Sequence, residues 1–459
     1  MTQSRRDLIQ RSALVGGGLV FAGNLTGLFT GAPAVAAGLG RADRPGRGHG
    51  VGDLVPDPFG LLDLPDRFQY TIVSEAGEPT TDGGVLPDRF DGTATFASGR
   101  STFLVRNHEQ STGAAFPALA AAELTYDPAA HGGTSTVEID RRGDKVDEYV
   151  SLAGTNNNCA GGPTPWGTWL TCEETEAKAG TSGMTKDHGF VFEVDPVHPE
   201  RNVAPTPLPA LGRFAHEATT TDPRTGIVYM TEDAGGPNGL VYRCLPNQPL
   251  RGHGSLRAGG LLQAMRCTDQ GTFVPDLSAY SEPGTTLRVG WVDVPDPLAT
   301  TVSTRTQLTE VTRSRKFEGA WWGNGSAFIV CSYARNSDGS VGQHDGQVWR
   351  HDPGRGTLTL EVNFGVNPDT ASDNPDGPDN ITVSPWGGVI LAEDGEGVQH
   401  LLAVTPDGAT LLLARNARDD GEFTGVTFSS DRRTLYANLQ QPGITFAITG
   451  PFNKIRHGA

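Results

Sequence analysis

The chain has 459 residues, of which 36% are hydrophobic and 19% are charged, and these values exclude a disordered protein. The formal net charge of −17 excludes non-specific binding of nucleic acid, because a phosphate backbone would be repelled. With 61 Gly and 32 Pro and no long apolar run of helical period, the composition predicts an all-β fold of short strands and tight turns.

The first predicted element is an export signal. A twin arginine, Arg5-Arg6, precedes an apolar stretch from Ala13 to about Phe29, and the small residues Ala34-Val35-Ala36 follow it. This order predicts a twin-arginine signal peptide over residues 1–37 that leaves no stable membrane span after cleavage. The expected partner is the twin-arginine export machinery, and the expected location is the periplasm, the cell surface or the medium. Because this route carries proteins that are already folded around cofactors, it favours a metalloprotein.

Residues 38–66 are predicted to form an extended leader, and residues 67–459 a single domain built from a repeat. Each repeat segment has an acidic residue or cysteine, an apolar strand, a tight turn, a second strand and often another acid. The segments begin at Asp91, Cys159, Glu217, Glu318, Asp379 and Glu422. Two antiparallel strands return the chain to the face that it left, so both ends of a segment are expected at one mouth.

Six such segments predict a six-bladed β-propeller with a metal-lined central funnel. The interval from residue 217 to residue 318 is nearly double the others, which predicts an insertion near residues 244–290 that forms a loop or flap. A seventh, degenerate blade is the competing interpretation of the same interval.

The repeat gathers candidate metal ligands at the shared mouth. They are Glu109, Cys159, Glu173, Glu174, Glu217, Glu232, Asp233, Glu318, Asp379, Glu393 and Asp394. So many like charges would repel one another unless cations lay between them. Carboxylate oxygens suit Ca²⁺ or Mg²⁺, and a thiolate among them could also hold iron. Asp91 and Glu422 are as simply explained as turn residues or strand caps.

The remaining patterns exclude other chemistry or leave it open. The five cysteines, at positions 159, 172, 244, 267 and 331, are an odd number, so a disulfide framework cannot use them all, and their pairing stays open. His108 and His216 are either structural or orient neighbouring acids. There is no nucleophile elbow, P-loop or HExxH motif, which disfavours a serine nucleophile.

Several longer strings resemble the PhoX family of bacterial alkaline phosphatases over about residues 60–450. They are Asn107-His108-Glu109, Asn158-Cys159-Ala160-Gly161-Gly162, Thr164-Pro165-Trp166-Gly167-Thr168, Cys172-Glu173-Glu174, Phe214-Ala215-His216-Glu217, Thr231-Glu232-Asp233, Phe317-Glu318-Gly319 and Pro378-Asp379-Asn380. The resemblance implies a six-bladed propeller that holds two Fe³⁺ and two or three Ca²⁺ ions, with the thiolate of Cys159 bridging the irons. It also implies hydrolysis of phosphate monoesters, and possible action on diesters, outside the cytoplasm.

By the same resemblance, the catalytic residues are Cys159, Glu217, Glu318 and Lys316, and the other acids share calcium or bridging roles. Lys316 is a departure, because the family usually has arginine there, and an ammonium cannot fork onto phosphate oxygens. Arg313, Arg315 and Arg335 are the basic residues nearby that could compensate. Two other functions fit a propeller: a calcium-dependent, lactonase-like hydrolase, which usually needs one central ion, and a non-catalytic binding propeller stabilised by calcium.

Overall fold

A computed structural model describes residues 51–235, 238–333, 342–366 and 374–455. The predicted signal peptide and the first part of the predicted leader lie outside these residues. In the described chain the fold is all-β, and its helices are short 3₁₀ turns. They are η1 (Ala122–Leu124), η2 (Pro199–Arg201), η3 (Pro209–Leu211), η4 (Ser255–Ala258), η5 (Leu277–Ala279), η6 (Thr304–Thr306) and η7 (Phe452–Lys454). None of these helices has the length and apolar character needed to cross a membrane.

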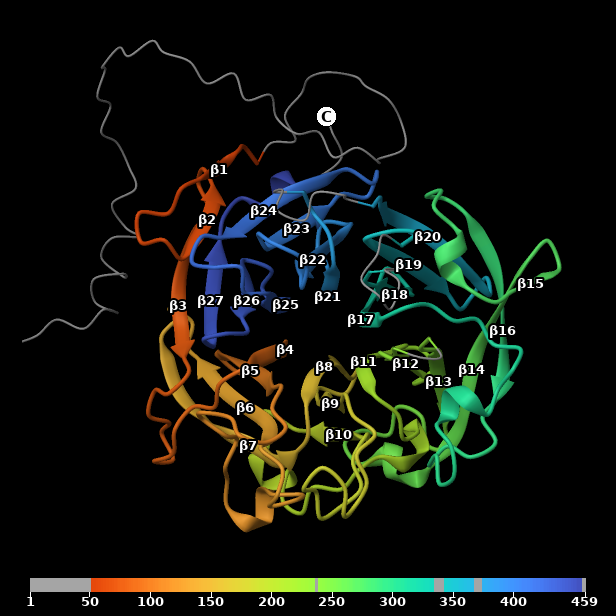
Figure 1. Cartoon of the computed structure of the whole chain (residues 1–459). Helices are drawn as coiled ribbons and strands as arrows, with labels where there is room; N and C mark the ends of the chain where they lie inside the picture. The colour runs from red at the N-terminus through yellow and green to blue at the C-terminus, as the bar shows by residue number, and fades with distance from the viewer. Residues whose placement is uncertain (1–50, 236–237, 334–341, 367–373, 456–459) are drawn as a thin grey trace, which may run out of the picture.

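The strands form five sheets around a common centre (Figure 1). One sheet contains β4 (Phe90–Ser98), β5 (Ser101–His108), β6 (Gly132–Ile139) and β7 (Lys145–Thr155). The next contains β8 (Asn158–Pro163), β9 (Trp169–Glu173) and β10 (Val191–Val194). A third contains β25 (Phe423–Phe428), β26 (Thr434–Leu439), β27 (Ile444–Thr449) and β3 (Gln69–Glu75). A fourth has the order β1 (Leu54–Val55), β2 (Leu62–Pro65), β24 (Thr410–Asn416), β23 (His400–Val404), β22 (Val389–Glu393) and β21 (Pro378–Val383).

The fifth sheet has ten strands and contains two antiparallel four-stranded runs. The first run is β11 (His216–Thr221), β12 (Val228–Glu232), β13 (Val241–Pro246) and β14 (Gly260–Asp269). The second is β17 (Phe317–Gly323), β18 (Ser326–Cys331), β19 (Gly346–Asp352) and β20 (Thr357–Phe364). β16 (Thr286–Asp293) pairs with both β14 and β20 and joins the runs, and β15 (Thr272–Val274) pairs with β14.

The innermost strands close a ring around the centre. β4 contacts β8, β8 contacts β11, β11 contacts β17, β17 contacts β21, β21 contacts β25, and β25 contacts β4 (Figure 1). Glycines allow the close approach: a Cβ atom on Gly92 would lie 2.6 Å from the Cα atom of Ala160, and one on Gly319 would lie 2.6 Å from the carbonyl oxygen of Asp379. The architecture is therefore propeller-like, with the start of every innermost strand close to one axis.

The two ends of the described chain meet in one sheet. β3 pairs antiparallel with β27, so an early strand completes the sheet that the last three strands form (Figure 1). β2 pairs with β24 in the neighbouring sheet, and the Asp63 carboxylate there accepts a hydrogen bond from the Arg415 guanidinium at 2.9 Å. Residues 62–75 therefore tie two adjacent sheets together.

Residues 244–290 differ from the loop or flap that we expected. They contain the second half of β13, all of β14 and β15, and most of β16. Burial alternates only over part of β14: Leu262 and Ala264 are buried and Leu261 is exposed, but Met265, next to Ala264, is buried as well. This broken alternation, with a leucine exposed, gives no clear strand pattern in the sequence.

Candidate metal centre

Each innermost strand begins with a β-bulge, and the candidate ligands lie there. In β4, Phe90 pairs with His108 but the next pair is Thr93 with Arg106, so β4 has one extra residue. The same shift occurs near the start of β8, β11, β17, β21 and β25. A bulge redirects the side chains at its position. In five of the six strands the residue that follows the first pair is an acid or a cysteine: Asp91, Cys159, Glu217, Glu318 and Asp379.

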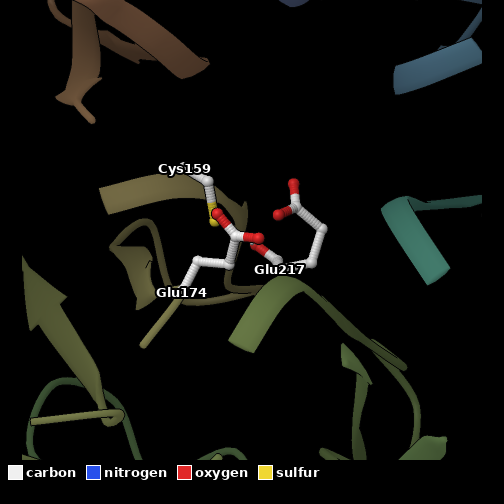
Figure 2. Close-up of side chains that lie close together, drawn as sticks. All are labelled: Cys159, Glu174 and Glu217. Carbon is white, nitrogen blue, oxygen red and sulfur yellow. The ribbon is translucent and has the colours of Figure 1, made fainter. Parts of the chain in front are cut away.

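Cys159, Glu174 and Glu217 form the first group of possible ligands. Cys159 lies in β8, Glu174 directly follows β9, and Glu217 lies in β11. One ligand atom from each lies within 4.8 Å of the other two. Figure 2 shows the sulfur and the two carboxylates close together at the ends of these elements. One thiol and two carboxylates from three separate segments thus converge on one point.

Two further groups continue from the first. Glu217 also lies within 4.8 Å of Glu318 and Asp379, and Asp379 lies within the same distance of Asp394 and Glu422. Glu217 and Asp379 therefore each belong to two groups, and the three groups form a continuous chain of possible metal sites.

The charges of these groups are incompatible with one another in the absence of cations. Burial is the largest cause that raises the pKa of Glu217 well above its usual value, and the neighbouring carboxylates of Asp379, Glu318 and Glu174 raise it further. Burial, followed by Glu217 and Glu174, raises the pKa of the Cys159 thiol in the same way. Since ionised carboxylates are retained in a protein interior only when paired or bound to metal, this arrangement fits bound cations.

Asp91 supports this fit by an independent observation. Its side chain is 4% exposed, and its Oδ1 atom has no hydrogen-bond partner among the described residues. The carboxylates of Glu109, Asp379 and Glu422 raise its pKa in addition to burial. An unpaired, buried carboxylate oxygen that faces other acids is the donor that a hard cation takes.

Lys316 contacts one of the grouped acids directly. Its Nζ atom lies 3.1 Å from Oε1 of Glu318, and its side chain is 40% exposed. Burial raises the pKa of Glu318 to about 7, although Lys316 lowers it. Arg313, which we considered as a compensating guanidinium, donates instead to the carbonyl oxygens of Asn238, Arg305 and Leu308. Arg335 lies outside the described residues.

Five of the expected ligands lie outside all three groups, and three of these five accept hydrogen bonds in the sheets. The Glu173 carboxylate accepts from the backbone N–H groups of Asn156, Gly189 and Phe190 at 2.8–3.0 Å and pairs with His188 Nδ1 at 2.6 Å.

Glu232 and Glu393 have the same kind of environment. Glu232 accepts from Leu240 N–H, Tyr242 Oη and Arg305 at 2.8–3.2 Å. Glu393 accepts from the N–H groups of Asp376 and His400 and pairs with His400 Nδ1, at 2.8–2.9 Å. We expected both acids of each pair at the mouth, but successive side chains of a strand point to opposite sides, so only the second acid of the pair can face the centre.

Glu109 and Asp233 lie beside the groups rather than in them. The Glu109 carboxylate accepts from the side-chain amide of Asn157 at 3.2 Å and from that of Gln440 at 2.6 Å. Asp233 hydrogen-bonds Glu174 and raises the pKa of that residue. Both acids therefore adjoin grouped ligands and could complete a coordination shell.

Sequence reasoning missed two acids and two amides at the centre. Glu422 belongs to the third group and its carboxylate raises the pKa of Asp91, yet in the sequence both were as simply explained as turn residues or strand caps. Asn157 and Gln440 were not considered, although the Asn157 amide also donates to Glu174 at 3.0 Å. The available signal was position, because Asp91 and Glu422 begin repeat segments just as Glu217 does.

The other cysteines and the two histidines play structural parts. All five cysteines are free and buried, so no disulfide forms within the described chain. His108 Nδ1 bonds the carbonyl oxygen of Asp88 at 2.9 Å and its Nε2 bonds Ser135 Oγ at 2.8 Å, while His216 Nε2 bonds the carbonyl oxygen of Gly212 at 3.1 Å. Burial lowers the pKa of each histidine to about 3, which keeps both neutral.

Comparison with known proteins identifies one family. The family model described as alkaline phosphatase PhoX matches residues 49–148 and 143–443. No curated protein matches the chain in sequence.

Among solved structures, PhoX of Pseudomonas fluorescens in complex with vanadate, a transition state analogue, is similar with a TM-score of 0.67 and 17% identity, covering 89% of this chain and 100% of that one. A gluconolactonase from Xanthomonas campestris has a TM-score of 0.40 and 14% identity, over 89% of this chain and 99% of that one. The PQQ domain of a pyranose dehydrogenase from Coprinopsis cinerea has a TM-score of 0.39 and 10% identity, over 86% and 98%.

Proposed function

Because this chain belongs to the PhoX family of alkaline phosphatases and is a phosphoric ester hydrolase, we propose that its three linked groups hold the metal ions of the reaction. The observation that carries the proposal is the sharing of Glu217 and Asp379 between groups, which would bring neighbouring ions close together. A chain of sites suits a substrate that presents several oxygens at once.

The donor atoms divide the proposed sites into two kinds. Cys159 supplies sulfur to the first group, and Glu217 links this group to Glu318, so these residues would hold two Fe³⁺ ions. The third group offers only carboxylates, from Asp379, Asp394 and Glu422, and suits Ca²⁺, of which we propose two or three. When bound, such ions supply Lewis-acid stabilisation of charge on phosphoryl oxygens and a reactive oxygen nucleophile at alkaline pH.

The protein's own part in the proposed reaction is positioning and charge. The bulges aim the ligands at one axis, and Glu173, Glu232 and Glu393 fix the strand ends from which Glu174, Asp233 and Asp394 project. Lys316 holds a positive charge 3.1 Å from Glu318, where it would attract one phosphoryl oxygen as a point charge. The vanadate complex of the Pseudomonas fluorescens protein supports a phosphoryl site in this fold.

We further infer the finer organisation of the chain. The ten-stranded sheet divides at β16 into two four-stranded runs, so the five sheets amount to six blades, one for each repeat segment. Residues 1–37 would direct export by the twin-arginine route, and hydrolysis would take place outside the cytoplasm. The expected substrates are phosphate monoesters, with diesters as a secondary class.

Activity and metal content, measured on the same purified proteins, test this proposal. Hydrolysis of p-nitrophenyl phosphate is measured at alkaline pH with Ca²⁺, together with elemental analysis, for the wild type, Cys159→Ala and the matched control Cys244→Ala, a buried free cysteine in β13. We expect Cys159→Ala to lose iron and activity and Cys244→Ala to keep both. Equal activity in all three proteins would remove the thiolate from the site. One calcium and no iron per chain would favour the lactonase-like alternative, and full metal content without turnover would favour the binding propeller.

A further inference from the structure

The residue directly before an innermost strand has a left-handed backbone in four of the six strands. The φ angles are +51° for Arg89 before β4, +56° for Asn157 before β8, +45° for Lys316 before β17 and +49° for Gly377 before β21. Only glycine adopts this conformation without cost, so three non-glycine residues are strained at one recurring position. Strain of this kind persists where the surrounding structure holds it, and it is frequent at ligand-binding positions.

Two of these three side chains reach the acids of the candidate metal centre. Lys316 contacts Glu318 at 3.1 Å, and the amide of Asn157 donates to Glu174 at 3.0 Å and to Glu109 at 3.2 Å. The residue before an innermost strand therefore borders the candidate metal centre at both β8 and β17.

Arg89 occupies the same position and still has its guanidinium available. Its backbone carbonyl accepts the N–H of Glu109 at 3.0 Å, so Arg89 lies directly beside that acid. The guanidinium charge opposes the rise that burial causes in the pKa of Glu109. Arg89 is exposed, and no salt bridge or hydrogen bond engages its side chain among the described residues. Arg213 and Arg305, by contrast, are bonded to Glu176 and its neighbours.

Arg89 is more accessible than the most buried grouped ligands. Cys159, Glu217 and Glu318 are at most 5% exposed, whereas Arg89 is exposed. A chain with a formal net charge of −17 repels anionic substrates at long range. An exposed guanidinium would offset this repulsion and fork onto two oxygens of an anionic group.

We propose that Arg89 binds a second anionic group of the substrate, on the leaving-group side, so that the enzyme prefers phosphoesters whose alcohol carries a carboxylate or another phosphate. This inference rests on the proposed function and adds a substrate class to it. Arg89 contacts the substrate away from the reacting phosphorus, so it affects KM more than kcat.

The test compares two esters that differ in one group. The leaving alcohol of glycerol 3-phosphate is neutral. That of 3-phosphoglycerate carries a carboxylate where glycerol has a hydroxymethyl group. Arg89→Gly removes the side chain and suits the left-handed backbone, so the fold is kept. Arg432→Gly is the matched control, because Arg432 is also an exposed arginine with a positive φ, +65°, but lies in the turn between β25 and β26.

We expect the wild type to favour 3-phosphoglycerate and Arg89→Gly to lower kcat/KM for that ester about tenfold through KM, with glycerol 3-phosphate changed less than about twofold. Arg89→Lys should restore part of the loss, and the effect should shrink at high salt. If Arg89→Gly leaves the ratio of kcat/KM for the two esters unchanged, or if Arg432→Gly changes it equally, the assignment of Arg89 is overturned. The proposed function would then still stand. Failure of the wild type to hydrolyse either ester would overturn the proposed function and this inference with it.

Discussion

Replacing Glu217 by glutamine should have opposite effects on the metal-free and the metal-loaded protein. Glu217 lies within 4.8 Å of ligand atoms in two groups. Two unit charges at that distance repel by about 3.5 kcal/mol at an effective dielectric constant of about 20. For a chain of 459 residues, about 1 kcal/mol of unfolding free energy corresponds to roughly one degree, so relief of one such pair raises the melting temperature of the metal-free protein by about 3–4 °C.

The effect of Glu217→Gln on the stability of the metal-free protein depends on pH. Because burial and neighbouring acids raise the pKa of Glu217 in the folded state, its contribution to stability is fully present at low pH and is lost as the pH rises. The gain from Glu217→Gln should therefore appear at pH 8 and vanish near pH 4. With metal, the variant should lose at least one ion per chain and at least about 100-fold in activity, since even the residues behind metal ligands cost 10–100-fold.

Thermal melts with a chelator at both pH values, and elemental analysis without it, measure these effects. Glu361→Gln is the control, because Glu361 pairs with Arg350 outside the three groups and its loss relieves no repulsion. A metal-free Glu217→Gln protein that melts at or below the wild type at pH 8, or a gain that is independent of pH, would refute the argument that cations are required.

Three further predictions concern neighbouring residues. Glu173→Gln should lower the melting temperature by about 2–3 °C with and without metal, because Glu173 accepts several buried hydrogen bonds. Glu174→Gln should instead lower the metal content without lowering the melting temperature in this way. Melts and elemental analysis of both variants distinguish these two outcomes. Lys316→Ala should raise the pKa of Glu318 above about 7 and move the loss of metal-free stability to higher pH, as followed by melts from pH 5 to 9. Arg305→Ala should cost about 3–5 kcal/mol in denaturant unfolding, because it leaves Glu232 buried without its cation; an unchanged midpoint would contradict this.

The fold was largely predictable from the repeat, because strand–turn–strand units with acids at both ends recur in the sequence. What spacing could not supply is the side toward which each acid points. Glu173 and Glu174 are adjacent and chemically identical, yet one accepts hydrogen bonds inside the sheet and the other faces the centre. Strand alternation contains this information, but it becomes usable only once the strand end is placed to within one residue.

The composition of the site was predictable in the same partial way. Cys159, Glu217 and Glu318 follow from equivalent positions, and the structure brings their segments together. Asp91 and Glu422 were left out of the predicted ligands because a single acid at the start of a strand is usually a cap. Lys316 was found through the family resemblance. The placement of Asn157 and Arg89 depends on a positive φ, which no residue pattern reveals unless glycine occupies the position, as Gly377 does.

The pairing of β3 with β27 determines when the ring of sheets can close. Asp91 and Glu109 come from the beginning of the ring and Glu422 and Gln440 from its end, and the Gln440 amide reaches Glu109 across 331 positions of sequence. A nascent or truncated chain that lacks its final strands contains only some of the ligands. Its ring of sheets is also not closed, so the ligands from the two ends of the ring are not brought together. The third group, which includes Glu422, can therefore form only after the last strands have been synthesised, whereas the ligands of the first group all lie between residues 159 and 217.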